Sequence, residues 1–289
     1  MRRFSGLRLA AVGSVMAGLL AAGSAIPVAA VSASNSNPNN YLALGDSVPF
    51  GYDPLLVQPG VSPNAFIGYP QLASELFRPR LKVFNAACPG ETSTSLISGT
   101  RPDNGCQNYR QFVGALHVSY SGSQLGYAES YVAANPRTKF VSLMIGANDL
   151  FRLQDSCQGT PDVTACLYAG LPALLNTLAG NLTTIYSGLR AAGFTGDFVA
   201  VTYYSLDYAD PATTGAIGAV DQVLATVTQA FGGKVADGFG AFAAATAASG
   251  GDSCAAGLLI HLSATTCDVH PSPAGAAVLA SALHAAEGT

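Results

Sequence analysis

From residue 40 to the C-terminus, short apolar runs alternate with longer segments that have helical periodicity. The apolar runs predict buried strands over residues 42–44, 81–87, 139–145, 197–203 and 234–237. The helical segments cover residues 69–77, 124–134, 167–192, 215–231 and 273–286. Strands joined by helices pair in parallel and must be covered on both faces. The alternation therefore predicts an α/β fold, a three-layer α/β/α sandwich with a central parallel sheet.

Glycine and short polar residues follow the predicted strands. The first strand stops at Gly45-Asp46-Ser47, the second is followed by Gly90, and the third runs into Gly146-Ala147-Asn148-Asp149. The carboxyl ends of parallel strands share one edge of the sheet, and ligands bind there in open α/β sheets. We therefore expect Ser47, Gly90 and Asn148 to converge at this edge. Taken alone, Gly-Asp-Ser favours an ordinary turn, because all three residue types are common in turns.

The N-terminus has the layout of a secretory signal peptide. Three arginines precede an apolar run, rich in Ala and Gly, that extends from about residue 9 to residue 31 and ends in small residues. We predict a signal peptide over 1–33, a polar lead-in over 34–39 and a single domain over 40–289. A retained membrane anchor is the alternative, since the run is long enough to span a bilayer. The composition favours cleavage and therefore a secreted protein.

Charge and composition argue against a nucleic-acid partner and against a disordered chain. Removal of the three leader arginines leaves ten Lys and Arg against 17 Asp and Glu, a net charge of −7. This acidic balance lacks the basic footprint of a nucleic-acid-binding protein. Charged residues make up only 10% of the chain and hydrophobic residues 49%, which is typical of a well-packed globular protein rather than a disordered one. We expect a monomer with no nucleic-acid partner.

Six cysteines in an exported chain favour disulfides over free thiols. Their spacing suggests that sequence neighbours pair, as Cys88–Cys106, Cys157–Cys166 and Cys254–Cys267. Six cysteines allow 15 pairings, however, so the sequence leaves the connectivity open. No Cys-x-x-Cys pair occurs, which argues against a zinc site.

A serine nucleophile needs a base to take its proton, and four histidines are candidates. His117 lies in a loop-rich stretch, and His284 lies in the last turn of a predicted helix, where a cation is favourable in any protein. His261 follows an apolar run and is expected to satisfy its polar atoms locally. His270 stands in a cysteine-anchored loop before the last predicted helix, with Asp268 two residues earlier. We therefore predict His270 as the base.

Four separated blocks together resemble the GDSL family of lipases and esterases, also called SGNH hydrolases. The blocks are Gly45-Asp46-Ser47 with Gly51-Tyr52, Asn85 to Thr92, Gly146-Ala147-Asn148-Asp149, and Asp268-Val269-His270-Pro271. They follow in the family's order and span nearly the whole chain after the leader. The resemblance implies a flavodoxin-like sandwich, hydrolysis of carboxylic esters through an acyl-enzyme, and no metal or cofactor.

The resemblance also implies a role for each matched residue. Ser47 is the expected nucleophile, and His270 the expected base and then acid. The backbone N–H groups of Ser47 and Gly90 and the side-chain amide of Asn148 are the expected oxyanion hole. Glycine lets the backbone approach an oxyanion closely, and an amide donates without titrating. The family's acid stands three residues before the histidine, where this chain has a cysteine, so the Asp268 carboxylate and a main-chain carbonyl remain alternatives for orienting His270.

The sequence does not identify the natural substrate. Apolar residues beside Ser47 and the third strand end favour an acyl pocket for lipid or aliphatic esters; they are Val48, Phe50, Tyr52, Leu150 and Phe151. We expect a small-molecule or lipid ester as substrate and at most transient contact with a lipid surface. The alternatives are O-deacetylation of a polysaccharide, since the family includes both activities, and a non-catalytic surface-binding module that retains the fold.

Overall fold

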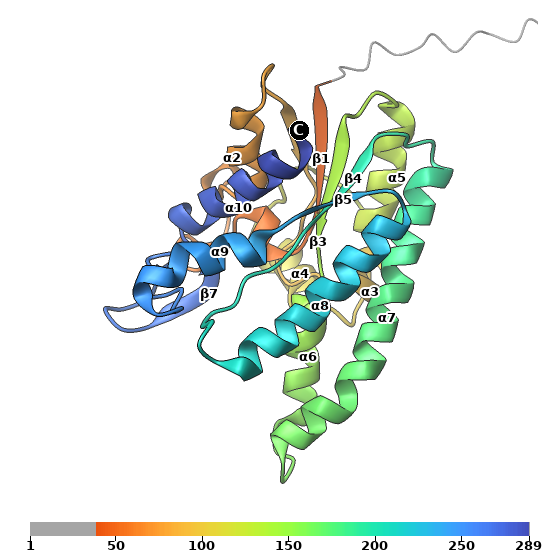
Figure 1. The fold of residues 1–289 in the computed structure, drawn as a ribbon. Helices are drawn as coiled ribbons and strands as arrows, with labels where there is room; N and C mark the ends of the chain where they lie inside the picture. Colours follow the sequence, from red (N-terminus) through yellow and green to blue (C-terminus); the bar gives the residue numbers. More distant parts are fainter. Residues whose placement is uncertain (1–38, 289) are drawn as a thin grey trace, which may run out of the picture. The chain divides into compact units, whose positions relative to one another are not determined.

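A computed structural model describes residues 39–288 of the chain. The predicted signal peptide and all of the predicted lead-in except its last residue lie outside this range. Within it, five parallel strands form one sheet and helices cover both of its faces, which confirms the predicted α/β sandwich (Figure 1).

The order of the strands creates a crevice beside the first one. The order is β2-β1-β3-β4-β5. The strands are β1 (Asn40–Gly45), β2 (Lys82–Asn85), β3 (Phe140–Met144), β4 (Asp197–Val201) and β5 (Lys234–Ala236), and each was predicted. The chain moves from β1 to β2 in one direction and then to β3 on the other side, so the winding reverses at β1. In doubly wound sheets, such a reversal opens the ligand crevice at the carboxyl ends of the two strands.

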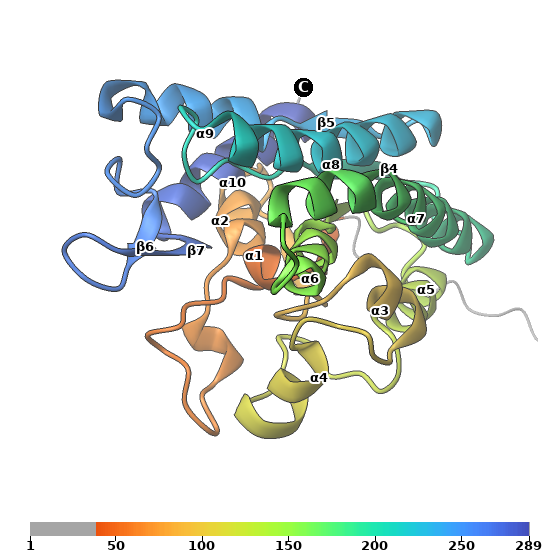
Figure 2. The same ribbon diagram turned by 90° about the horizontal axis from the view of Figure 1, so that it is seen from below.

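The helices are divided between the two faces of the sheet (Figures 1 and 2). One face carries α2 (Tyr69–Leu76) and α10 (Pro273–Glu287), which pack against each other, with α9 (Gly238–Thr246) beside α10. The other face carries α3 (Ser93–Ser98), α5 (Gln124–Ala134), α7 (Val163–Ala191) and α8 (Pro211–Ala230). The connections contain α1 (Ser47–Phe50), α4 (Cys106–Asn108), α6 (Ala147–Cys157) and the hairpin of β6 (Leu259–His261) and β7 (Cys267–Pro271).

Two helices begin one turn earlier than predicted, because aspartates cap them. The Asp162 side chain accepts the Ala165 N–H at 2.9 Å, so α7 starts at residue 163 rather than 167. Pro172 consequently lies inside α7. Asp210 caps α8 in the same way, and a proline occupies the first position of that helix. Both α7 and α8 therefore extend further past the carboxyl edge of the sheet than the sequence suggested.

Strand β1 is buried along its whole length, as a central strand of a parallel sheet must be. Tyr41 stacks on Phe140 of the neighbouring strand, with ring centroids 4.2 Å apart. Its hydroxyl lies 2.7 Å from the Ser142 hydroxyl, so the polar atom is satisfied inside the core. The turn that follows β1 is consequently anchored to one of the most constrained parts of the molecule.

Three disulfides occur in the described chain with the pairing that the spacing suggested: Cys88–Cys106, Cys157–Cys166 and Cys254–Cys267. The first ties the loop after β2 to α4. The second joins the end of α6 to the first turn of α7, and the third anchors the start of β7. Each disulfide thus fixes a connection on the carboxyl side of the sheet, where loops have few other constraints.

Candidate active site

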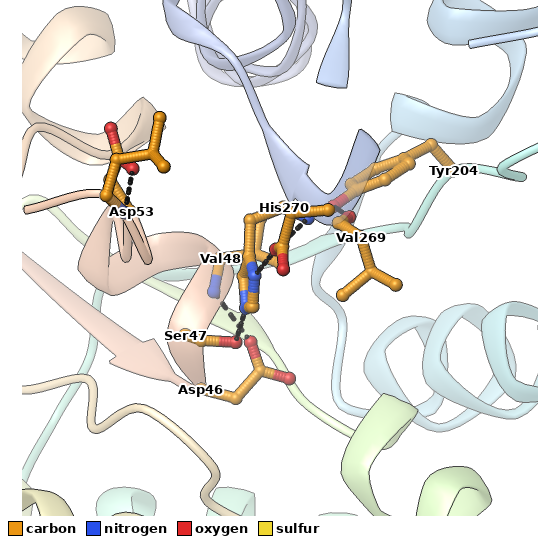
Figure 3. Close-up of polar contacts among 9 residues, drawn as sticks. Asp46, Ser47, Val48, Asp53, Tyr204, Val269 and His270 are labelled. Atoms are coloured by element: carbon orange, nitrogen blue, oxygen red, sulfur yellow. Dashed lines mark hydrogen bonds and ion pairs between the residues drawn. The ribbon is translucent and has the colours of Figure 1, made fainter. Parts of the chain in front are cut away.

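Ser47 begins α1 immediately after the first strand. Gly45 has a φ of +136°, and a Cβ at this residue would lie 2.1 Å from the Met144 carbonyl oxygen, so the turn requires glycine. The Asp46 carboxylate caps α1 by accepting the Val48 N–H at 3.0 Å (Figure 3). The Ser47 side chain therefore lies at the carboxyl edge of the sheet on a turn with little freedom.

His270 lies on strand β7 rather than in the predicted loop, because this segment pairs with β6. Its Nε2 atom is 2.8 Å from the Ser47 Oγ atom (Figure 3). The Tyr204 hydroxyl donates to the Val269 carbonyl at 2.7 Å. Together with the disulfide at Cys267, this bond holds the strand that carries the histidine.

Asp268 contacts the other ring nitrogen of His270. Its Oδ1 atom lies against Nδ1 and also accepts the backbone N–H of His270 at 3.0 Å. Residues two apart in a strand share a face, which explains why the shorter spacing still brings the carboxylate to the imidazole. Burial raises the pKa of Asp268, but the hydrogen bonds and charge of His270 outweigh it and hold the pKa below its usual range. Of the two alternatives for orienting His270, the carboxylate is the group in contact.

Asn148 stands in the first turn of α6, directly after β3, and its side chain is buried. Its Oδ1 atom accepts from the Asn104 side-chain amide at 2.8 Å, and its Nδ2 atom donates to the Glu91 carbonyl at 3.0 Å. These bonds fix which way the amide points. The Nδ2 atom consequently faces the turn that carries Ser47, where Asp46 Oδ2 is 3.4 Å away.

Gly90 lies in the loop after β2, beside the Ser47 turn. It has a φ of +80°, and a Cβ there would approach the Asn104 carbonyl oxygen to 2.4 Å, so both conformation and space demand glycine. In the same loop, the Cys88 N–H donates to the Gly45 carbonyl at 3.1 Å. The structure thus gathers Ser47, His270, Asp268 and Asn148, with the Gly90 loop hydrogen-bonded to the turn.

Two residues that hold site side chains in place were not predicted from the sequence. The Tyr203 hydroxyl donates to Asp46 Oδ2 at 2.5 Å, and the Asn104 side chain orients Asn148. Tyr203 follows the fourth strand, so its position at the shared carboxyl edge was the available signal. Asn104 lies in a stretch without periodicity, and only the folded loop brings it to the site.

A cavity of about 420 Å³ opens beside Ser47 and His270. It lies between α6, the first part of α7 and the start of α8. Its larger aliphatic and phenyl lining residues are Val48, Leu150, Phe151, Leu167, Leu171, Leu206, Ile217 and Val269. Both the volume and the apolar wall are typical of a small-molecule pocket.

Of the apolar residues expected in the pocket, Val48, Leu150 and Phe151 line it, whereas Phe50 and Tyr52 do not. Residues two apart on a helix point in different directions, so α1 turns Val48 to the cavity and Phe50 away from it. Phe50 packs on Phe66 in a separate buried cluster, with centroids 5.2 Å apart. The Tyr52 ring lies 4.8 Å from the His270 ring and so borders the imidazole instead.

Burial raises the pKa of Asp46 to about 6, although hydrogen bonds from Tyr203 and Val48 favour the charged form and offset part of the effect. An unfolded aspartate has a pKa of about 4. Between these two values the native state binds the proton more tightly than the unfolded state. Asp46 therefore makes the protein progressively less stable as the pH rises from about 4 to 6.

Asp46→Asn should remove this pH dependence. The free energy of unfolding of the variant should rise relative to wild type by roughly 2 to 3 kcal/mol between pH 4 and pH 7, the equivalent of about two pKa units. Urea unfolding of both proteins across this range measures the difference. A difference that stays constant with pH would contradict the assignment of a raised pKa to Asp46.

Comparisons with known proteins identify the family and the fold. Residues 43–278 match the GDSL-like lipase/acylhydrolase family. No curated protein sequence matches the chain. A phospholipase A1 from Streptomyces albidoflavus NA297 shares 22% identity and a TM-score of 0.56, over 86% of this chain and 99% of that one. An acetylxylan esterase from Geobacillus stearothermophilus shares 18% identity and a TM-score of 0.55, over 88% and 96%.

At such identities the solved structures establish the fold alone. The family match is different, because it extends over residues 43–278, which is most of the chain. This protein therefore belongs to the GDSL-like lipase/acylhydrolase family and is an ester hydrolase.

Proposed function

We propose that the protein is a secreted carboxylic-ester hydrolase that cleaves aliphatic acyl esters through an acyl-enzyme on Ser47. One observation carries the proposal: Ser47 Oγ lies 2.8 Å from His270 Nε2 at an apolar cavity. A nucleophile within hydrogen-bond reach of a base, with the base held by a third group, is the arrangement that acyl transfer requires.

The first step is attack on the ester. With Nδ1–H directed to Asp268, the neutral imidazole presents its Nε2 lone pair to the Ser47 hydroxyl. Nε2 takes the proton as Ser47 Oγ bonds to the carbonyl carbon. The imidazolium that forms is stabilised by the ionised Asp268 carboxylate, which itself stays unprotonated.

The carbonyl oxygen becomes an oxyanion in this step. We assign the N–H groups of Ser47 and Gly90 and the Asn148 Nδ2 atom as its donors. Asn148 would turn an N–H now shared with Asp46 and the Glu91 carbonyl towards the oxyanion. Each such donor typically contributes about 3 kcal/mol to stabilising the transition state.

Collapse of the intermediate completes the acylation. His270 returns its proton to the alcohol oxygen as the carbon–oxygen bond breaks, and the alcohol leaves. Water then attacks the acyl-enzyme, with His270 again acting first as base and then as acid. The carboxylic acid is released and the Ser47 hydroxyl is restored.

The cavity supports an aliphatic acyl chain as the group transferred. Its wall is largely apolar, and burial of each CH₂ group of a substrate stabilises binding by about 0.8 kcal/mol. An acetyl group would leave most of the roughly 420 Å³ unfilled. Polysaccharide O-deacetylation, the activity named for one structural neighbour, is therefore the second candidate.

Secretion is supported by the predicted leader and by three disulfides, which persist in oxidising compartments. Transient contact with lipid surfaces is supported by α7, which borders the cavity. This helix is long and apolar enough to cross a membrane by composition, yet little of its most apolar stretch is buried in the described fold.

Asp268→Asn tests the arrangement of the base. An asparagine cannot stabilise the imidazolium and can hold His270 in the wrong tautomer, so kcat should fall by several hundredfold. Steady-state kinetics with a soluble aryl ester measure the effect. Asp53→Asn, which alters a carboxylate on the neighbouring loop that accepts the Leu55 N–H at 2.8 Å, is the control and should stay within twofold of wild type. A loss below tenfold in the Asp268 variant would favour a main-chain carbonyl as the orienting group.

Ala216→Phe tests the acyl pocket. Ala216 lies in the cavity wall on α8, and a phenyl ring there would occupy the space that we assign to the acyl chain of the substrate. In a series of aryl esters, kcat/KM for octanoate should fall at least tenfold while that for acetate changes less than threefold. Ala230→Phe, at the exposed end of the same helix, is the matched control. A strict preference of the wild type for acetate would contradict an aliphatic acyl chain as the transferred group and favour polysaccharide O-deacetylation.

A further inference from the structure

Two buried polar side chains near the site have no part in the proton transfers. Gln124, at the first turn of α5, is 1% exposed, and Glu91, in the loop after β2, is 2% exposed. Burying an amide and a carboxyl group costs free energy unless their hydrogen bonds are met. Their partners therefore indicate what the two side chains do.

Gln124 hydrogen-bonds to one residue, Gly45, through both the oxygen and the nitrogen of its side-chain amide. Its Oε1 atom accepts the Gly45 N–H at 2.6 Å, and its Nε2 atom donates to the Gly45 carbonyl at 3.0 Å. Gly45 is the last residue of β1 and stands two residues before Ser47. The Gln124 amide thus makes the two backbone hydrogen bonds that a neighbouring strand would otherwise make at the end of β1. It thereby fixes the direction in which the backbone enters the Ser47 turn.

Glu91 continues the chain of hydrogen bonds to the other two loops. Its Oε2 atom accepts from Gln124 Nε2 at 3.2 Å, and its Oε1 atom accepts the Ser95 hydroxyl at 2.5 Å. Its backbone carbonyl accepts from Asn148 Nδ2 at 3.0 Å. Because Glu91 directly follows Gly90, its side chain also fixes the Gly90 peptide. Ser47, Gly90 and Asn148 are thereby connected through two buried side chains.

We propose that Gln124 and Glu91 are positioning residues that set the relative placement of the three oxyanion-hole donors. The inference rests on the proposed function. The donors come from three separate loops, and donors that act on an oxyanion must lie within about 3 Å of it in the transition state. Neither side chain touches the ester; both act through the backbone of Gly45 and Glu91.

Gln124→Met is the direct test, because methionine keeps the length of the side chain and loses both bonds to Gly45. We expect kcat for a soluble aryl acetate to fall at least tenfold while KM changes less than threefold, since the loss is confined to the transition state. Tyr186→Phe is the matched control. It removes a buried 2.6 Å hydrogen bond to Thr228, between α7 and α8, and should lower the melting temperature without changing kcat.

A conservative substitution at Glu91 separates positioning from simple loss of stability. Glu91→Gln keeps an acceptor for Gln124 Nε2 and should keep kcat within threefold of wild type. Glu91→Leu loses the side-chain bonds to Gln124 and Ser95 and should lower kcat at least tenfold. A Glu91→Leu enzyme with wild-type kcat would overturn the proposal, as would a Gln124→Met enzyme with wild-type kcat.

Failure of this inference differs from failure of the proposed function. If Ser47→Ala retains hydrolysis, the assignment of the nucleophile is wrong. If Ser47→Ala is inactive and Gln124→Met is fully active, only the positioning role is wrong. Melting temperatures of all variants, measured beside the kinetics, show whether each protein is folded at the assay temperature.

Discussion

The hydrogen bond between Ser47 and His270 joins residues that are 223 positions apart, and the rest of the site depends on it. One partner is fixed by a fully buried strand and a glycine turn, the other by a disulfide-anchored hairpin and the Tyr204 hydroxyl. Tyr204 itself lines the cavity, but most of the apolar wall comes from α6, α7 and α8, which carry neither Ser47 nor His270. The catalytic pair can therefore stay rigid while the acyl pocket varies, as expected where function lies in loops on a fixed scaffold.

Polar groups in this site are buried, and hydrogen bonds compensate for that burial. Asp46 is held by the Tyr203 hydroxyl and the Val48 N–H, and Asn148 by Asn104 and the Glu91 carbonyl. Donors that are held in place before the reaction need little reorganisation to stabilise developing charge, and here only an Asn148 N–H has to turn towards the oxyanion. The ionised Asp268 lies on the opposite side of His270, where its charge favours the imidazolium rather than opposing the oxyanion.

The sequence predicted the sheet and the residues at its edge because both follow from short-range patterns. Apolar runs marked all five strands, and glycine with small polar residues marked their ends. It did not predict α6, the hairpin around His270 or the part of the cavity wall that α7 and α8 form. Those features depend on tertiary contacts: β7 becomes a strand only by pairing with β6, and Phe50 turns away from the pocket only because α1 forms. Asn104 carries no local signal, and Tyr203 carries only its position at the end of the fourth strand, which does not identify Asp46 as its partner.

The most direct test of the account is covalent labelling of the folded protein with a fluorophosphonate, followed by peptide mass spectrometry. The reagent reacts with a serine that has an adjacent base and an oxyanion hole. The account predicts a single adduct on Ser47, abolished by His270→Ala and slowed by Gln124→Met. An unlabelled Ser47 in protein shown to be folded, or an adduct on another serine, would contradict it.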